Sequence, residues 1–158
     1  MIRLTRLADY AVLLLTHMAL EDERQKGRVH TAADLARETH VPAPTVSKLL
    51  GLMSRGGLLA SQRGHSGGYV LAVSPSEISA ADIISVVDGP IALTECIEDA
   101  PGECGIESLC GVRGAWQRIN GAIRNALDGV TLAELIEDQK SVFLGSTADR
   151  VPEDAKAG

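Results

Sequence analysis

The stretch VPAPTVSKLLGLMSRGGLLASQRGHSGGYVLA, residues 41–72, decides the fold of this chain. Its first half predicts a helix, because Pro44 suits a first helical turn and apolar residues recur at helical spacing. Gly56 and Gly57 then end that helix. Two segments of strand character, LLASQR and YVLAV, flank the glycine-rich turn GHSGG and predict a β-hairpin. The apolar positions of the helix are Val46, Leu49, Leu50 and Met53.

A second short helix is predicted directly before this stretch. It starts in HTAADLARE, with Thr31 as its N-cap and Asp34 three residues later in a near capping box. Two short helices joined by a tight turn and followed by a hairpin are typical of a winged helix. An earlier helix over residues 5–20, capped by Thr5, supplies apolar residues that complete its core: Ala11, Leu14, Leu15 and Met18.

The second half of the chain predicts three more helices. Ser79 caps one that runs through AADIISVVDG, a longer one covers residues 114–127, and Thr131 with Glu134 forms a capping box for a last short one. We expect a mainly α fold with a small β-hairpin, namely a winged helix-turn-helix domain plus a long dimerisation helix. Residues 1–78 would form the DNA-binding domain, whose first helix also packs on the dimer region. Residues 79–140 would hold a cysteine loop and the dimerisation helix, and residues 141–158 a disordered tail.

Charge is divided unevenly between the two halves. The net charge is −6, but residues 1–75 carry nine Lys/Arg against six Asp/Glu, while residues 76–158 carry six against fifteen. A mildly basic first half beside an acidic second half indicates that only the first half meets a polyanion. The first apolar run is interrupted by Asp9, Thr16 and His17, so we expect a cytoplasmic protein without a membrane-spanning segment.

Candidate DNA contacts follow from the winged-helix pattern. Recognition helices enter the major groove at their N-terminal end, which points to Thr45, Ser47 and Lys48. Arg63 leads into the wing tip and His65 lies on it, where a cation could enter a minor groove or bind phosphate. Each of these residues alone could instead solvate a helix face or protect a strand edge.

The long helix carries one apolar stripe, formed by Trp116, Ile119, Ile123 and Leu127. Such a stripe is compatible with the core of a single chain, and it is also what a dimer interface needs. A two-fold homodimer would match a palindromic operator in double-stranded DNA.

All three cysteines, Cys96, Cys104 and Cys110, lie in one loop rich in Gly, Pro and acidic residues. Seven residues separate the first pair and five the second, which matches neither zinc fingers nor ferredoxins. Three thiolates could still converge on zinc or an iron–sulfur cluster, both of which prefer soft ligands. The histidines at 17, 30, 40 and 65 lie outside the loop, so the fourth ligand stays open. Reactive or incidental thiols are the remaining interpretation.

Residues 1–140 resemble the Rrf-type family of winged-helix regulators, which includes the iron–sulfur proteins IscR and NsrR. The resemblance lies in RLTRLADYAV, the stretch 41–72, the cysteine loop and TLAEL. The segment from residue 89 to 127 looks most like the branch that regulates the SUF iron–sulfur assembly system.

The resemblance implies that the three cysteines hold an iron–sulfur cluster. IscR-like members place a histidine ligand three residues after the third cysteine, where this chain has Arg113, and their first spacing is five. NsrR-like members use an aspartate from the partner subunit, and Asp9 matches that position. The missing histidine favours a 4Fe–4S over a 2Fe–2S cluster, with zinc as the alternative. Asp9 could instead be an acidic residue that the positive end of the helix dipole stabilises, with no role as a ligand.

The expected function is therefore a cluster-sensing transcriptional repressor of iron–sulfur assembly genes. A regulator of nitric-oxide or redox stress, and a zinc or thiol switch, are the alternatives that keep DNA binding. A cluster-carrying adaptor protein would lack the steep salt dependence of a phosphate-contacting DNA reader. We expect no enzyme, because GHSGG lacks the strand-to-helix context of a nucleophile elbow.

Overall fold

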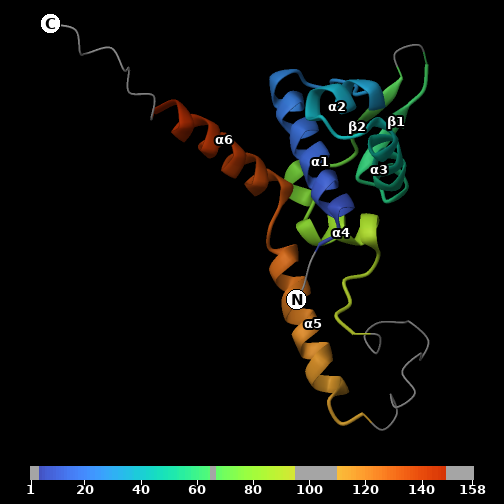
Figure 1. The fold of residues 1–158 in the computed structure, drawn as a ribbon, viewed down its shortest axis with the longest axis vertical. Helices are drawn as coiled ribbons and strands as arrows, with labels where there is room; N and C mark the ends of the chain where they lie inside the picture. The colour runs from blue at the N-terminus through green and yellow to red at the C-terminus, as the bar shows by residue number, and fades with distance from the viewer. Residues whose placement is uncertain (1–3, 65–66, 95–109, 149–158) are drawn as a thin grey trace, which may run out of the picture.

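The computed structural model describes residues 4–64, 67–94 and 110–148. Within these ranges, the chain forms six α-helices and one two-stranded sheet, which lies at one edge of the body (Figure 1). The elements run in the order α1 (Arg6–Arg24), α2 (Ala32–Thr39), α3 (Ala43–Arg55), β1 (Leu59–Gln62), β2 (Gly68–Leu71), the 3-10 turn η1 (Pro75–Glu77), α4 (Ala80–Asp88), α5 (Arg113–Asp128) and α6 (Leu132–Ala148).

The helices begin where the sequence predicts. The Thr5 hydroxyl accepts a hydrogen bond from the Ala8 amide at 3.2 Å, and the Thr31 hydroxyl accepts one from the Asp34 amide at 3.1 Å. Thr131 and Glu134 bond each other reciprocally, as a capping box requires. These short polar side chains satisfy amides that the first helical turn leaves unpaired.

A tight turn separates α2 from α3. His40 ends α2 in the left-handed conformation, with φ at 59°. Val41 is buried beside it, and Pro42 starts α3 without a side-chain cap. The turn therefore redirects the chain within three residues and packs α3 against α2, which is the helix-turn-helix arrangement.

The hairpin that follows α3 is antiparallel. Leu59 pairs with Leu71 and Gln62 with Gly68. On its other side, β2 forms one bridge to the segment before α2, in which His30 and Tyr69 exchange backbone hydrogen bonds of 2.9 and 2.8 Å. Gly68 is required there, because a Cβ would lie 2.5 Å from the His30 carbonyl oxygen. Helix pair and hairpin confirm the winged-helix fold.

One hydrophobic core joins the winged helix to the start of α6. The apolar positions predicted on the first and third helices are all buried. Ile78 and Ile83 bring α4 into the same core, and Leu132 and Ile136 bring in α6. The core is aliphatic, as expected from a chain with four aromatic residues.

Helix α5 extends away from this body, and α6 continues past the expected end of the ordered chain (Figure 1). Leu132 N donates to Ile78 O and Ala80 N to Val130 O, both at 2.8 Å, so the α5–α6 junction is fixed to the start of α4. The prediction of a disordered tail from residue 141 is wrong for residues 141–148, which are helical. Extending a formed helix costs little, and no proline intervenes before Pro152.

Candidate nucleic-acid interface and metal centre

The N-terminal half of α3 presents polar residues on one face. Ser47 and Lys48 are exposed and Thr45 is half-buried, while Val46 and Leu49 on the opposite face are buried. Packing against α2 holds the helix in place and leaves its polar face exposed, which is the geometry of a recognition helix. His40, exposed at the turn before α3, belongs to the same region.

The wing leaves the body immediately after β1. Arg63 is exposed at this point, and Gly64 adopts φ of 122°, a conformation open to glycine. The predicted contact His65 lies outside the described residues. Ser61 and Gln62, the last two residues of β1, are exposed as well, so the wing presents polar side chains beside Arg63.

A network of charged side chains links α1 to α2. Arg28 bonds Glu21 and, at 2.8 Å from Nη2 to Oε1, Glu38. His17 Nε2 lies 2.8 Å from Glu38 Oε2. The hydrogen bond from His17, with the nearby Arg28 guanidinium, lowers the pKa of the Glu38 carboxyl. The network therefore favours the ionised form of Glu38 and links the two helices.

His30 lies beside this network with its ring buried. It is 2% exposed, and neither ring nitrogen has a hydrogen-bond partner in the described part of the chain. Burial lowers the pKa of His30, and the positive charge of Arg28 lowers it further. The ring is therefore held neutral in the folded protein.

Of the candidate metal ligands, the structure describes two. Cys110 is a half-buried free thiol three residues before α5, and Arg113 N donates to its carbonyl oxygen at 3.4 Å. Asp9 is an exposed carboxylate in the first turn of α1. Cys96 and Cys104 lie outside the described residues.

Asp9 and Cys110 belong to opposite ends of α5. Asp9 lines a groove between α1, α4 and α6 that includes Leu127, near the C-terminal end of α5. Cys110 precedes the N-terminal end, so the two residues are about 20 Å apart along that helix. Within ranges 4–64, 67–94 and 110–148, no three His, Cys, Asp or Glu side chains are placed to hold a metal ion.

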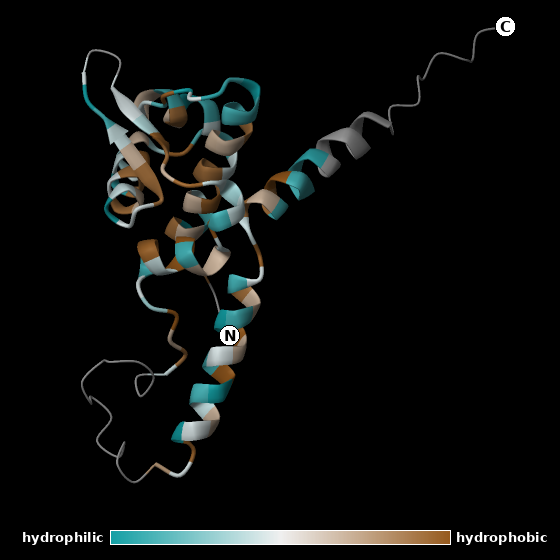
Figure 2. Cartoon of the chain, turned by 180° about the vertical axis from the view of Figure 1, so that it is seen from behind, coloured by the Kyte–Doolittle hydropathy of each residue, from teal (hydrophilic) through white to brown (hydrophobic). Residues whose placement is uncertain are grey.

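The predicted apolar stripe on α5 is largely open. Trp116 and Ile119 are 37% and 44% exposed, and Ile123 and Leu127 are half-buried. Hydrophobic positions on the part of α5 that stands clear of the body are visible in Figure 2. The interpretation of the stripe as intrachain core is therefore wrong for Trp116 and Ile119, because α5 protrudes instead of packing along the body.

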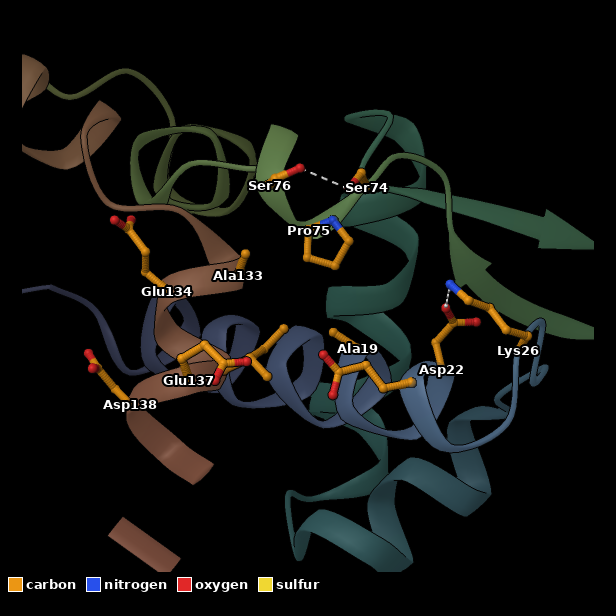
Figure 3. Close-up of a pocket in the computed structure, with 12 residues that line it drawn as sticks. Ala19, Asp22, Lys26, Ser74, Pro75, Ser76, Ala133, Glu134, Glu137 and Asp138 are labelled. Atoms are coloured by element: carbon orange, nitrogen blue, oxygen red, sulfur yellow. Dashed lines mark hydrogen bonds and ion pairs between the residues drawn. The ribbon is translucent and has the colours of Figure 1, made fainter. Parts of the chain in front are cut away.

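A second groove, between α1, η1 and α6, is acidic (Figure 3). Asp22, Glu134, Glu137 and Asp138 line it around Pro75, and Lys26 is paired with Asp22 at 3.3 Å. Carboxylates repel phosphate groups, so this groove is not part of a nucleic-acid interface.

A helix-turn-helix with an exposed polar recognition face and a β-hairpin wing defines a winged-helix DNA-binding protein. The chain belongs to the Rrf2 family, whose model, described as an iron-dependent transcriptional regulator, matches residues 4–138. This match confirms the resemblance to the family. The narrower resemblance to the regulators of the SUF system stays a prediction.

Relatives and solved structures agree with this assignment. The regulator NsrR of Geobacillus kaustophilus is 29% identical over 140 residues, which cover 89% of this chain and 93% of that one. The regulator IscR of Aliivibrio salmonicida is 31% identical over 138 residues, 87% and 79% of the two chains. The structure of CymR, the global cysteine regulator of B. subtilis, matches with a TM-score of 0.64 and 28% identity over 87% of this chain and 98% of that one.

The chain is accordingly a DNA-binding transcriptional regulator and not an enzyme. Among the described helices, none combines the length and the apolar character needed to cross a membrane.

Proposed function

We propose that this regulator is a homodimer that senses iron–sulfur status and represses genes of iron–sulfur cluster assembly. Cys96, Cys104 and Cys110 of one subunit and Asp9 of the partner subunit would hold the cluster. The observation that carries the proposal is the placement of Asp9 and Cys110, an exposed carboxylate and a free thiol, at opposite ends of α5.

A two-fold axis perpendicular to α5 would bring these two groups together. It pairs the α5 helices antiparallel, so the N-terminal end of one helix meets the C-terminal end of the other. Cys110 would then face the partner's Asp9. The exposed Trp116 and Ile119 would be covered in the same interface, which removes apolar area from water.

The donor set suits an iron–sulfur cluster. Thiolates select iron–sulfur clusters or zinc over hard cations, and Arg113 stands where IscR-like members supply a histidine. A 4Fe–4S cluster is therefore favoured over a 2Fe–2S cluster. When bound, it supplies a link between the subunits that oxidation can break.

We also propose which residues contact the operator. Thr45, Ser47 and Lys48 would enter a major groove, and Arg63 with His65 would bind at the flanking phosphates or minor groove. Two recognition helices related by the dimer axis would read a palindromic site.

A thiol or zinc switch is the second candidate. It is favoured by the similarity to CymR, the global cysteine regulator of B. subtilis. The CymR of Staphylococcus aureus, to which the chain is also similar, has been solved in an oxidized form. This alternative keeps the DNA-binding surface unchanged and replaces the cluster by zinc or by oxidation of the thiols.

Metal analysis of protein purified without oxygen tests the proposal. We expect near-stoichiometric iron and acid-labile sulfide, with visible charge-transfer absorption, and little zinc. Asp9→Ala should shorten the lifetime of the absorption in air, while Glu23→Ala, at the other end of α1, should leave it unchanged. Zinc alone, or no metal, would favour the second candidate, and an unchanged lifetime in Asp9→Ala would remove Asp9 from the ligand set.

A further inference from the structure

A buried amide lies in the middle of the protruding helix. Asn120 is 3% exposed and is the one buried residue of α5, every residue of which is described. Its Oδ1 accepts a hydrogen bond of 3.2 Å from the backbone N–H of Leu93. A polar side chain is costly to bury unless it is paired, so this contact fixes Leu93 and α5 to each other.

This bond adds a second point of attachment to the one at the base of α5. The first is the junction at residues 128–132, where backbone hydrogen bonds join Val130 to Ala80 and Leu132 to Ile78. Asn120 lies eight residues before Asp128, about 12 Å along the helix. An attachment at the base alone would leave α5 free to tilt, whereas a further attachment along its length restricts its direction.

The chain that Asn120 holds leads directly to the cysteines. Leu93 lies three residues before Cys96, and the segment starts at Gly89, whose φ of 92° turns the chain out of α4. A displacement of about 1 Å at Leu93, acting about 12 Å from the base, would tilt α5 by about 5°. Such a tilt changes the relative orientation of the two winged helices in a dimer built on α5.

We propose that Asn120 is a positioning residue that transmits the state of the cysteine loop to the direction of α5. The inference rests on the proposed function for the nature of the signal. The attachment itself depends only on Asn120 and Leu93.

Two variants separate the hydrogen bond from side-chain volume. Asn120→Leu keeps a side chain of similar size and removes the acceptor, whereas Asn120→Asp keeps an acceptor oxygen in the same place. Asn125→Leu, on the exposed side of the same helix, is the matched control.

Amide hydrogen exchange and operator binding are then measured on full-length protein, with a duplex that the wild type selects from a random library. In Asn120→Leu, the Leu93 amide should exchange at least about tenfold faster than in wild type. The ratio of operator affinities with and without the cluster, ordinarily about 5–150-fold for allosteric coupling, should fall to within about twofold of one. Asn120→Asp and Asn125→Leu should retain the wild-type exchange and the wild-type ratio.

Each outcome decides a separate step. Unchanged exchange at Leu93 in Asn120→Leu would overturn the attachment, whether or not a cluster exists. Faster exchange with an unchanged affinity ratio would overturn the transmission. Wild-type protein that takes up no iron and sulfide would refute the proposed function and the transmission with it, while the exchange result would still decide the attachment.

Discussion

His30 makes the stability of the winged helix sensitive to mild acid. Its ordinary pKa of 6.5 is lowered in the folded protein by burial and by Arg28. The unfolded chain therefore binds more protons than the folded one between the folded pKa and about 6.5. The stability contribution is complete above about pH 6.5 and is lost as the pH falls through the folded pKa.

We predict that the free energy of unfolding falls as pH is lowered from 7 to 5, by at most about 1.4 kcal/mol per pH unit from this group. His30→Leu should flatten the profile in urea titrations at each pH. His40→Asn, which changes an exposed histidine, should keep the wild-type slope. Equal slopes in wild type and His30→Leu would exclude His30 as the cause.

Lys48 is the clearest single test of the recognition face. It is exposed in the N-terminal half of α3, where a phosphate contact is expected. Lys48→Ala should weaken operator binding and reduce the slope of log affinity against log salt by about one. Lys26→Ala, in the loop after α1, should leave both quantities unchanged. A wild-type salt slope in Lys48→Ala would show that Lys48 contacts no phosphate.

At the scale of elements, the contact between α3 and α4 depends on a glycine. A Cβ on Gly56 would lie 2.5 Å from Cγ2 of Val86, which is closer than packed carbon atoms tolerate. We predict that Gly56→Ala lowers the free energy of unfolding by about 1–3 kcal/mol. Thermal and urea denaturation would measure the loss.

Two further variants identify the cause of that loss. Val86→Ala should rescue Gly56→Ala, because it removes the methyl groups that the new Cβ would strike. Gly51→Ala, inside the same helix, meets only the flexible end of Arg55 at 3.3 Å and should gain up to about 1 kcal/mol. Equal stability of Gly56→Ala and wild type would contradict the packing that sets α3 on α4.

At the scale of the whole molecule, α5 leaves apolar side chains open that a second subunit would cover. Ile119→Asp places a charge on the exposed stripe and should raise the dimer dissociation constant by at least about 30-fold, since central contacts are worth about 2 kcal/mol or more. Sedimentation velocity over a concentration series measures this. Asn125→Asp, on the same helix, is the control. A dimer of wild-type strength in Ile119→Asp would place the interface elsewhere.

Most of the local structure was predictable, because its causes are local. Thr5, Thr31 and Thr131 cap helices through bonds to residues three positions away, and such spacing is visible in the sequence. The buried faces of α1 and α3 follow from helical periodicity for the same reason. The end of α6 was misplaced, because a polar, small-residue composition was given more weight than helix propagation.

The candidate site was predictable in its residue types and not in its arrangement. The three cysteines, Asp9 and the polar start of α3 are apparent from spacing and resemblance. The sequence by itself thus determined the elements, the winged helix and the chemistry available to a metal.

Only the tertiary structure decided how these parts are related in space. It placed Asp9 and Cys110 at opposite ends of α5, buried the ring of His30 with no hydrogen-bond partner among the described residues, and joined Asn120 to Leu93 across 27 positions. Contacts of this kind depend on the direction in which α5 leaves the body. That direction is set by packing between elements that are distant in the sequence. Such packing leaves no periodic pattern of residues from which it could be predicted.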